Sequence, residues 1–115
     1  MKKVLIVEDE RDIVDVLKTA LENEGFEVSS ALDGGEGLEK IRSFKPDVIL
    51  LDIMMEGMDG VTMKKKMKDD IPIIIISACD GCVRESVEKE MNVYSWLEKP
   101  FNIDELIAEI NKVKK

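Results

Sequence analysis

The chain contains no histidine, and this absence excludes acid–base catalysis by imidazole. It also argues against a zinc site, because zinc in proteins is bound mainly by histidine and cysteine, and there are only two cysteines. Any chemistry must therefore rely on carboxylates, lysines and hydroxyl groups.

Basic residues are scarce relative to acidic ones. The sequence has 17 Lys and Arg against 25 Asp and Glu, which gives a net charge of -8, and it has no long basic run. Affinity for nucleic acid depends on neutralising backbone phosphates with Lys and Arg. We therefore expect no direct nucleic-acid binding by this domain.

Long hydrophobic runs are also missing. The longest, Ile71–Ile76, is interrupted by Pro72 and is far shorter than the ~20 residues of a membrane-spanning helix. The N-terminal segment Met1–Val7 does not resemble a secretory signal, because the acidic Glu8–Glu10 follows at once without a small-residue cleavage site. These features predict a cytoplasmic protein that does not enter the membrane.

What is present describes a globular domain. The 115 residues are 44% hydrophobic and 37% charged, which is typical of a folded protein and of one core. No linker, repeat or low-complexity segment divides the chain. The sequence predicts a single domain over residues 1–115.

Apolar runs rich in β-branched residues alternate with helical periodicities along the whole chain. The predicted strands are Lys3–Val7, Phe26–Ser30, Val48–Leu51, Ile71–Ile76 and Tyr94–Leu97. The helical patterns cover Ile13–Leu21, Leu38–Ile41, a short segment between Gly60 and Asp70, and Ile103–Val113. This alternation predicts an α/β fold, a doubly wound parallel sheet with helices on both faces.

Polar residues follow four of the five predicted strands. These are Glu8 and Asp9 after the first, Asp52 after the third, Ser77 after the fourth and Lys99 after the fifth. In an open parallel sheet, ligands bind outside the carboxyl ends of the strands. A strand order of 2-1-3-4-5 would bring all of these residues to one crevice.

Three carboxylates in one crevice repel one another, and a divalent cation would relieve this repulsion. A set of carboxylates, a backbone carbonyl and water suits Mg²⁺, which shares its coordination shell with phosphate groups. Lys99 and Ser77 could then donate to a phosphoryl group. Asp52 is the natural nucleophile, because a carboxylate attacks phosphorus without first losing a proton.

Five ordered segments resemble the receiver domain of two-component response regulators, and the similarity covers essentially the whole chain. They are Val4–Glu10, Pro46–Met55, Gly57–Gly60, Ile76–Ala78 and Lys99–Phe101. The resemblance implies the flavodoxin-like three-layer fold, with a five-stranded parallel sheet in the order 2-1-3-4-5.

The resemblance also implies a role for each site residue. Asp52 would be the phosphoacceptor, Glu8 and Asp9 the acidic pair, and Asp9, Asp52 and the backbone carbonyl of Met54 the holders of Mg²⁺. Ser77 and Lys99 would take phosphoryl oxygens. The donor would be a sensor histidine kinase or a small acyl phosphate, and the chain would catalyse only its own phosphorylation and dephosphorylation, so it is not expected to be an enzyme.

In this family, an aromatic residue three positions before the lysine turns inward on phosphorylation and changes the face formed by helix four, strand five and helix five. Here that residue is Trp96, where the family has Tyr or Phe. Either Trp96 switches or it is a fixed packing residue. The signal would pass to a downstream protein or to an output domain, and the same face could form a homodimer.

Two further departures from the family pattern lie near the site. Glu56 stands where the family usually has proline, and it is either a surface residue or a modifier of metal affinity. Cys79 and Cys82 form a C-x-x-C spacing, for which free thiols are the default and a redox pair the alternative.

Three other functions compete with the receiver interpretation. A haloacid-dehalogenase-type phosphatase also uses a strand-end Asp, but it requires a second Asp where Met54 stands. A flavodoxin-like FMN carrier needs a first loop that accepts phosphate, whereas Glu8–Glu10 would repel it. A phosphorylation-independent binding module would fail to bind Mg²⁺ or to accept a phosphoryl group.

Overall fold

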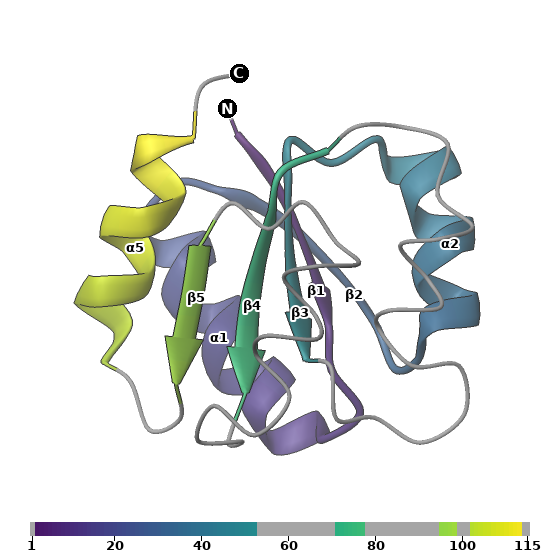
Figure 1. Ribbon diagram of the computed structural model, residues 1–115, viewed down its shortest axis with the longest axis horizontal. Coiled ribbons are helices and arrows are strands. Elements are labelled where there is room, and N and C mark those ends of the chain that lie inside the picture. The colour runs from purple at the N-terminus through teal and green to yellow at the C-terminus, as the bar shows by residue number, and fades with distance from the viewer. Residues whose placement is uncertain (1, 53–70, 78–94, 99–101, 114–115) are drawn as a thin grey trace.

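The computed structural model describes residues 2–52, 71–77, 95–98 and 102–113, and its centre is a five-stranded parallel sheet in the order β2-β1-β3-β4-β5 (Figure 1). The strands are β1 (Lys3–Val7), β2 (Glu27–Ala31), β3 (Val48–Asp52), β4 (Ile73–Ser77) and β5 (Ser95–Glu98). The described helices are α1 (Arg11–Asn23), α2 (Gly34–Phe44) and α5 (Ile103–Lys112). The predicted α/β class and strand order are confirmed.

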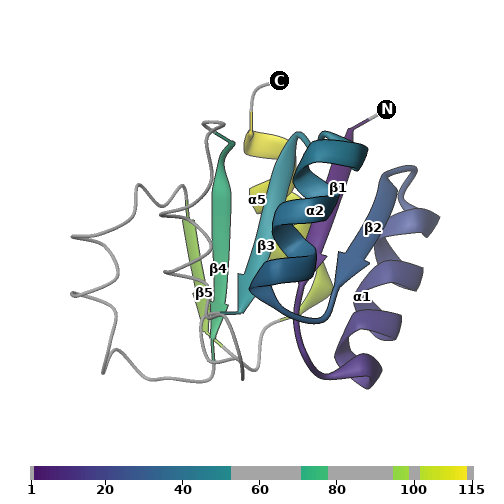
Figure 2. The ribbon, with the colours of Figure 1, turned by 90° about the vertical axis from the view of Figure 1, so that its right-hand side faces the viewer.

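The helices cover both faces of the sheet, because alternate residues of each buried strand contribute to two separate cores (Figure 2). One core joins the strands to α1 and α5, and includes Ile6, Leu50 and Ile74. The other joins them to α2, and includes Leu5 and Ile49. The central strands are buried on both faces, which explains their continuous apolar sequences.

Local sequence signals fix the helix ends. Asp33 caps α2 by accepting a hydrogen bond from the Glu36 N–H at 2.8 Å, and Asn102 caps α5 by accepting one from the Glu105 N–H at 2.7 Å. Gly25, just after α1, has a φ of 93°, a left-handed conformation that favours glycine. The glycine at this position lets the chain leave α1 and turn into β2.

Several predicted strand boundaries differ from those in the structure. The fourth strand begins at Ile73 rather than at Ile71, because Pro72 has no N–H to donate to the neighbouring strand. The Pro72 carbonyl still accepts a hydrogen bond from the Ile49 N–H at 3.0 Å. The second strand starts at Glu27, because the N–H of Phe26 instead closes the turn after α1 on Leu21 O. The short helix predicted between Gly60 and Asp70 lies outside the described residues.

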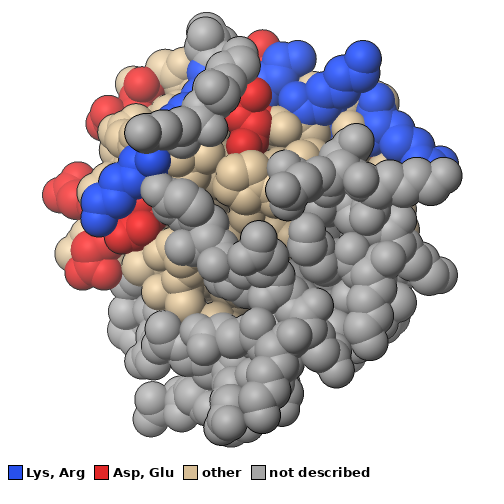
Figure 3. Space-filling model, turned by 45° about the horizontal axis from the view of Figure 1, so that its top comes forward, with Lys and Arg blue, Asp and Glu red and all other residues tan. Residues whose placement is uncertain are grey.

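None of the described helices is both long enough and apolar enough to span a bilayer. Charges on the surface are unevenly distributed. Figure 3 shows basic side chains gathered on the α2 side of one face, and acidic side chains mainly on the side of α5. Among the described residues of this view, basic and acidic side chains therefore lie mainly on different sides.

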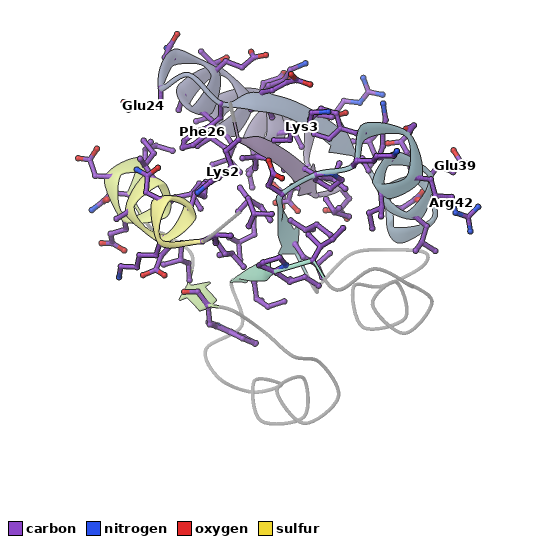
Figure 4. All side chains as sticks on the ribbon, turned by 90° about the horizontal axis from the view of Figure 1, so that it is seen from above. Lys2, Lys3, Glu24, Phe26, Glu39 and Arg42 are labelled. Atoms are coloured by element: carbon purple, nitrogen blue, oxygen red, sulfur yellow. The ribbon has the colours of Figure 1, made fainter. Side chains whose placement is uncertain are left out.

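Lys2, immediately before β1, ties the two ends of the described chain together. Its Nζ donates hydrogen bonds to the carbonyl oxygens of Ile110 and Val113, at 2.9 and 2.8 Å, where α5 ends (Figure 4). The last carbonyls of a helix have no partners within it, and they carry partial negative charge. The ammonium group therefore caps α5 and fixes it against the start of β1.

Replacing Lys2 with Met is expected to lower the free energy of unfolding by about 1–3 kcal/mol, because two hydrogen bonds from a charged donor are lost, while Ile110 O keeps the Val113 N–H at 3.1 Å. Chemical denaturation measures the change. Lys112→Met is the matched control, because Lys112 pairs with Glu109 on the exposed side of α5, one helical turn away. Equal losses in the two variants would contradict a capping role for Lys2.

Candidate functional site

The register of the sheet aligns the carboxyl ends of its central strands. Val7 lies beside Leu51, so the next residues, Glu8 and Asp52, emerge at the same level. On its other side, Asp52 is paired with Ile76, which immediately precedes Ser77. Strand ends far apart in sequence thus meet at one edge of the sheet, as the strand order predicts.

Glu8 is completely buried, although it is a charged residue directly after a strand. Its N–H extends the sheet by donating to Ala31 O at 3.0 Å, and its Oε2 accepts a hydrogen bond from the Asp9 N–H at 3.2 Å. The backbone bond holds the first acidic residue against the end of β2. This arrangement orients one carboxylate of the acidic pair before any cation binds.

The next residue, Asp9, differs from Glu8 in that its side chain is exposed to solvent. The acidic pair is thus divided into a buried, oriented carboxylate and an accessible one. The Ala31 carbonyl that holds Glu8 was not among the residues identified from sequence. Only the pairing register of the first two strands could have revealed it, because a backbone carbonyl leaves no signature in residue types.

The other predicted site residues are described to different extents. The structure places the backbone of Asp52 as the last residue of β3 and that of Ser77 as the last of β4. Ser77 is paired with Glu98, the last residue of β5, and Lys99 comes next in sequence. The side chains of Asp52 and Ser77, together with Met54, Lys99, Glu56, Cys79 and Cys82, lie outside the described part.

Trp96 lies in β5, opposite Ile75 of β4. It is partly buried and packs at the border of the core that contains Leu5 and Ile49, with its indole nitrogen shielded from solvent. The residue is therefore a packing element in this conformation. Its position one strand away from Ser77 keeps it adjacent to the strand ends that carry the polar residues.

The donor set fits a hard divalent cation. Carboxylates of Glu8 and Asp9 at the end of β1, next to the end of β3, provide only oxygen ligands, which Mg²⁺ prefers. Within the described side chains, no three His, Cys, Asp or Glu residues form a metal-binding group. The described side chains are those of the acidic pair, Glu8 and Asp9, whereas the carboxylate of Asp52 and the carbonyl of Met54 lie outside the described part.

The family model of the response regulator receiver domain matches residues 4–111 of this chain. The chain belongs to this family. The match spans every strand end considered above, and receiver domains act as signalling switches in two-component systems rather than as conventional enzymes.

Solved receiver domains have the same fold over nearly their whole length. The receiver domain of the Francisella response regulator 1452 is 35% identical, with a TM-score of 0.88 over 98% of this chain and 96% of that one. The Thermotoga maritima response regulator TrrA, solved in complex with Mg²⁺-BeF, is 32% identical, with a TM-score of 0.87 and coverage of 99% and 100%. The Vibrio cholerae chemotaxis protein CheY4 is 29% identical, with a TM-score of 0.89 and 99% coverage of both chains.

Proposed function

We propose that this receiver domain, formed by residues 1–115, accepts a phosphoryl group on Asp52 in a Mg²⁺-dependent reaction and signals through a conformational change. The observation that carries the proposal is the alignment of Glu8, Asp52 and Ser77 at one sheet edge, set by the pairing of β1, β3 and β4. The donor is a sensor histidine kinase or a small acyl phosphate, and the reaction takes place in the cytoplasm.

In the proposed transfer, a carboxylate oxygen of Asp52 attacks phosphorus and forms a new P–O bond. The P–N bond of a phosphohistidine breaks, or the P–O bond of an acyl phosphate, and the leaving group keeps the electron pair. The signal is ended by hydrolysis, in which water attacks phosphorus, the P–O bond to Asp52 breaks, and the free carboxylate and inorganic phosphate are formed. The chain thus modifies only itself and turns over no separate substrate.

Mg²⁺ would be held by Asp9, Asp52 and the backbone carbonyl of Met54, with Glu8 as the buried member of the acidic pair. When bound, the cation neutralises negative charge on the incoming phosphoryl group. Glu8 is already oriented by the Asp9 N–H, and the exposed Asp9 can reach a hydrated ion. The TrrA structure with Mg²⁺-BeF, a relative of similar length, supports the assignment.

Ser77 and Lys99 would donate to the phosphoryl oxygens, since a dianionic group at Asp52 attracts both. Both residues stand at the ends of strands neighbouring the acceptor or directly after them. Their inward movement would shift Trp96 and alter the face formed by helix four, β5 and α5. A downstream protein, an output domain or a homodimer partner would bind that face.

Incubation with acetyl phosphate and Mg²⁺ is expected to add one phosphoryl group, detected by intact-mass analysis. The addition should disappear with a chelator and in Asp52→Asn, because the amide is not a nucleophile towards phosphorus. Persistence of the added mass in Asp52→Asn would place the acceptor elsewhere. Absence of any addition, despite measurable Mg²⁺ binding, would instead indicate a phosphorylation-independent binding module.

Trp96 provides an internal reporter, since it is the only tryptophan of the chain. Phosphorylation, or BeF₃⁻ with Mg²⁺, is expected to change its fluorescence intensity by at least about a tenth, because the shielded indole moves relative to the sheet. Titration with BeF₃⁻ measures this effect. An unchanged spectrum in a protein that is fully phosphorylated by mass would show that Trp96 is a fixed packing residue and that the signal takes another route.

A further inference from the structure

The C-terminal end of α2 borders a hollow in the surface, with a volume of about 320 Å³. Its lining comes from the last turn of α2, the residues after it and the segment before β4, namely Ile41, Arg42, Lys45, Pro46 and Ile71. Ile41 and Pro46 are buried and supply apolar surface, whereas Arg42 and Lys45 are exposed. This set, the α2 hollow, therefore combines room for an apolar side chain with two cations.

The positive charge at the α2 hollow contrasts with the net charge of -8 of the whole chain. In the described part of the chain, the side chains of Arg42 and Lys45 make no hydrogen bond and no ion pair. Figure 4 shows Arg42 pointing outward from α2. Cations near a helix C-terminus also stabilise the helix modestly through its dipole, so the charge needs support from a second observation.

The backbone of Lys45 supplies that observation. Its φ of 54° and ψ of 64° are left-handed, a conformation that glycine adopts freely and that a residue with a Cβ adopts at a cost. After α1 the left-handed residue is Gly25, and among the described residues Lys45 alone has a positive φ without being glycine. Strain of this kind is concentrated at functional sites. Here it keeps a cationic side chain at the α2 hollow.

A protrusion of complementary chemistry lies on α1. Val16 is 62% exposed and is the only large apolar side chain of the described residues that is exposed. Asp12 and Asp15 are exposed as well, and they lie beside Val16 because residues i, i+3 and i+4 share one side of a helix. We call these three residues the α1 knob.

The α1 knob and the α2 hollow match in spacing and in charge. Asp12 and Asp15 are three positions apart on α1, and Arg42 and Lys45 are three positions apart at the end of α2, so each pair lies within about one helical turn. An apolar group adjoins each pair, a protruding side chain on α1 and a recess at α2. Two negative charges can therefore meet two positive ones around one apolar contact.

We propose that copies of this chain associate head to tail, with Val16 of one copy inserted into the α2 hollow of the next. Asp12 and Asp15 then face Arg42 and Lys45 of the neighbouring copy. At physiological ionic strength, charges more than about 8 Å apart are largely screened, so the opposite charges at the contact outweigh the repulsion between two chains of net charge -8. This contact is small, and the expected dissociation constant is on the order of 0.1–1 mM.

The two halves of the contact lie on opposite faces of the sheet. The helix α1 packs in the core that contains Ile6, and α2 packs in the core that contains Leu5 (Figure 4). One contact therefore leaves a free hollow on one copy and a free knob on the other, so that further copies can add. This arrangement differs from a twofold dimer through helix four, β5 and α5.

Sedimentation equilibrium of the full chain at physiological salt tests the proposal. The average mass of the unaltered chain is expected to rise beyond that of a dimer as the concentration increases. Asp15→Asn with Val16→Asn alters only the knob, and Arg42→Gln with Lys45→Gln alters only the hollow. Each double variant alone is expected to associate with a dissociation constant at least about tenfold larger than that of the unaltered chain.

An equimolar mixture of the two variants gives the sharpest result. The knob variant keeps an intact hollow and the hollow variant keeps an intact knob, so one contact can form between them and no other. The mixture is expected to give a species of two chains and nothing larger, which misfolded variants could not do. The matched control, Lys40→Gln with Lys112→Gln, removes the same charge as the hollow variant and should associate as the unaltered chain does.

Lys45→Gly separates the contact from folding. Glycine favours the left-handed conformation at this position, so the variant is expected to unfold at the same temperature as the unaltered chain or a higher one. It also loses the cation at the hollow, so its association is expected to weaken at least about threefold. Association as strong as in the unaltered chain would overturn the role of Lys45 in the contact.

The proposal as a whole is overturned if the unaltered chain remains monomeric at the highest soluble concentration. It is equally overturned if the chain stops at a dimer that survives both double variants, or if the mixture of variants stays monomeric. None of these measurements involves phosphorylation, so their outcome is independent of the phosphoacceptor assignment.

Discussion

Replacing Leu50 with Ala is expected to lower the free energy of unfolding by about 2–5 kcal/mol, a large part of the 5–15 kcal/mol that is usual for a domain. Leu50 lies in the central strand β3, between Ile6 of β1 and Ile74 of β4, and all three side chains have no solvent exposure. The truncation removes apolar contacts and leaves a cavity that neighbouring strands cannot close, because both are held by the ladder.

Urea denaturation monitored by circular dichroism measures this loss, and Val16→Ala is its matched control. Val16 is an apolar β-branched residue on α1 whose side chain is 62% exposed, so its truncation should change stability by less than about 0.5 kcal/mol. A Leu50→Ala protein as stable as the Val16→Ala protein would show that the inner sheet is not packed as described.

Replacing Glu8 with Gln is expected to raise the dissociation constant for Mg²⁺ by about 10–100-fold. The amide keeps an oxygen that can accept the Asp9 N–H but loses the charge that attracts the cation. Without Mg²⁺, the same variant is expected to be more stable than the unaltered chain by about 1 kcal/mol, because a fully buried carboxylate next in sequence to Asp9 no longer has to be kept charged.

These opposite effects separate a metal-binding role from a purely structural one. Calorimetric titration gives the Mg²⁺ affinity, and thermal unfolding with a chelator gives the stability. Glu10→Gln is the control, because Glu10 is exposed and its side chain makes no capping hydrogen bond to α1. Lower stability together with unchanged Mg²⁺ affinity in Glu8→Gln would assign Glu8 to folding alone.

The sequence predicted the fold well where one strong signal controls each element. Lys3–Val7 is a strand with the bounds expected, and β3 begins at Val48 as expected. Predicted strand boundaries were wrong where two sequence signals compete. The apolar content of Ile71 favoured a strand, but the missing N–H of Pro72 moved its start to Ile73.

The candidate site was predictable in part, because residue types reveal donors but not their environments. Glu8 and Asp9 are adjacent acidic residues, and nothing in their sequence shows that the first is buried and the second exposed. That difference arises from the continuation of β1 by one backbone hydrogen bond to Ala31. The roles of Asp52, Ser77 and Lys99 stay predictions, as does the bound Mg²⁺.

The hydrogen bonds from Lys2 to the C-terminal end of α5 bear on how firmly the two ends of this helix are held. Lys2 holds the helix at Ile110 and Val113, the end remote from the carboxyl edge of the sheet, whereas the N-cap Asn102 lies on the same side as the strand ends. Because Leu106 and Ile110 also hold α5 in the core, the end beside Lys2 is its most firmly attached part, and the N-terminal turn near the strand ends is held by packing of Ile103 and Leu106.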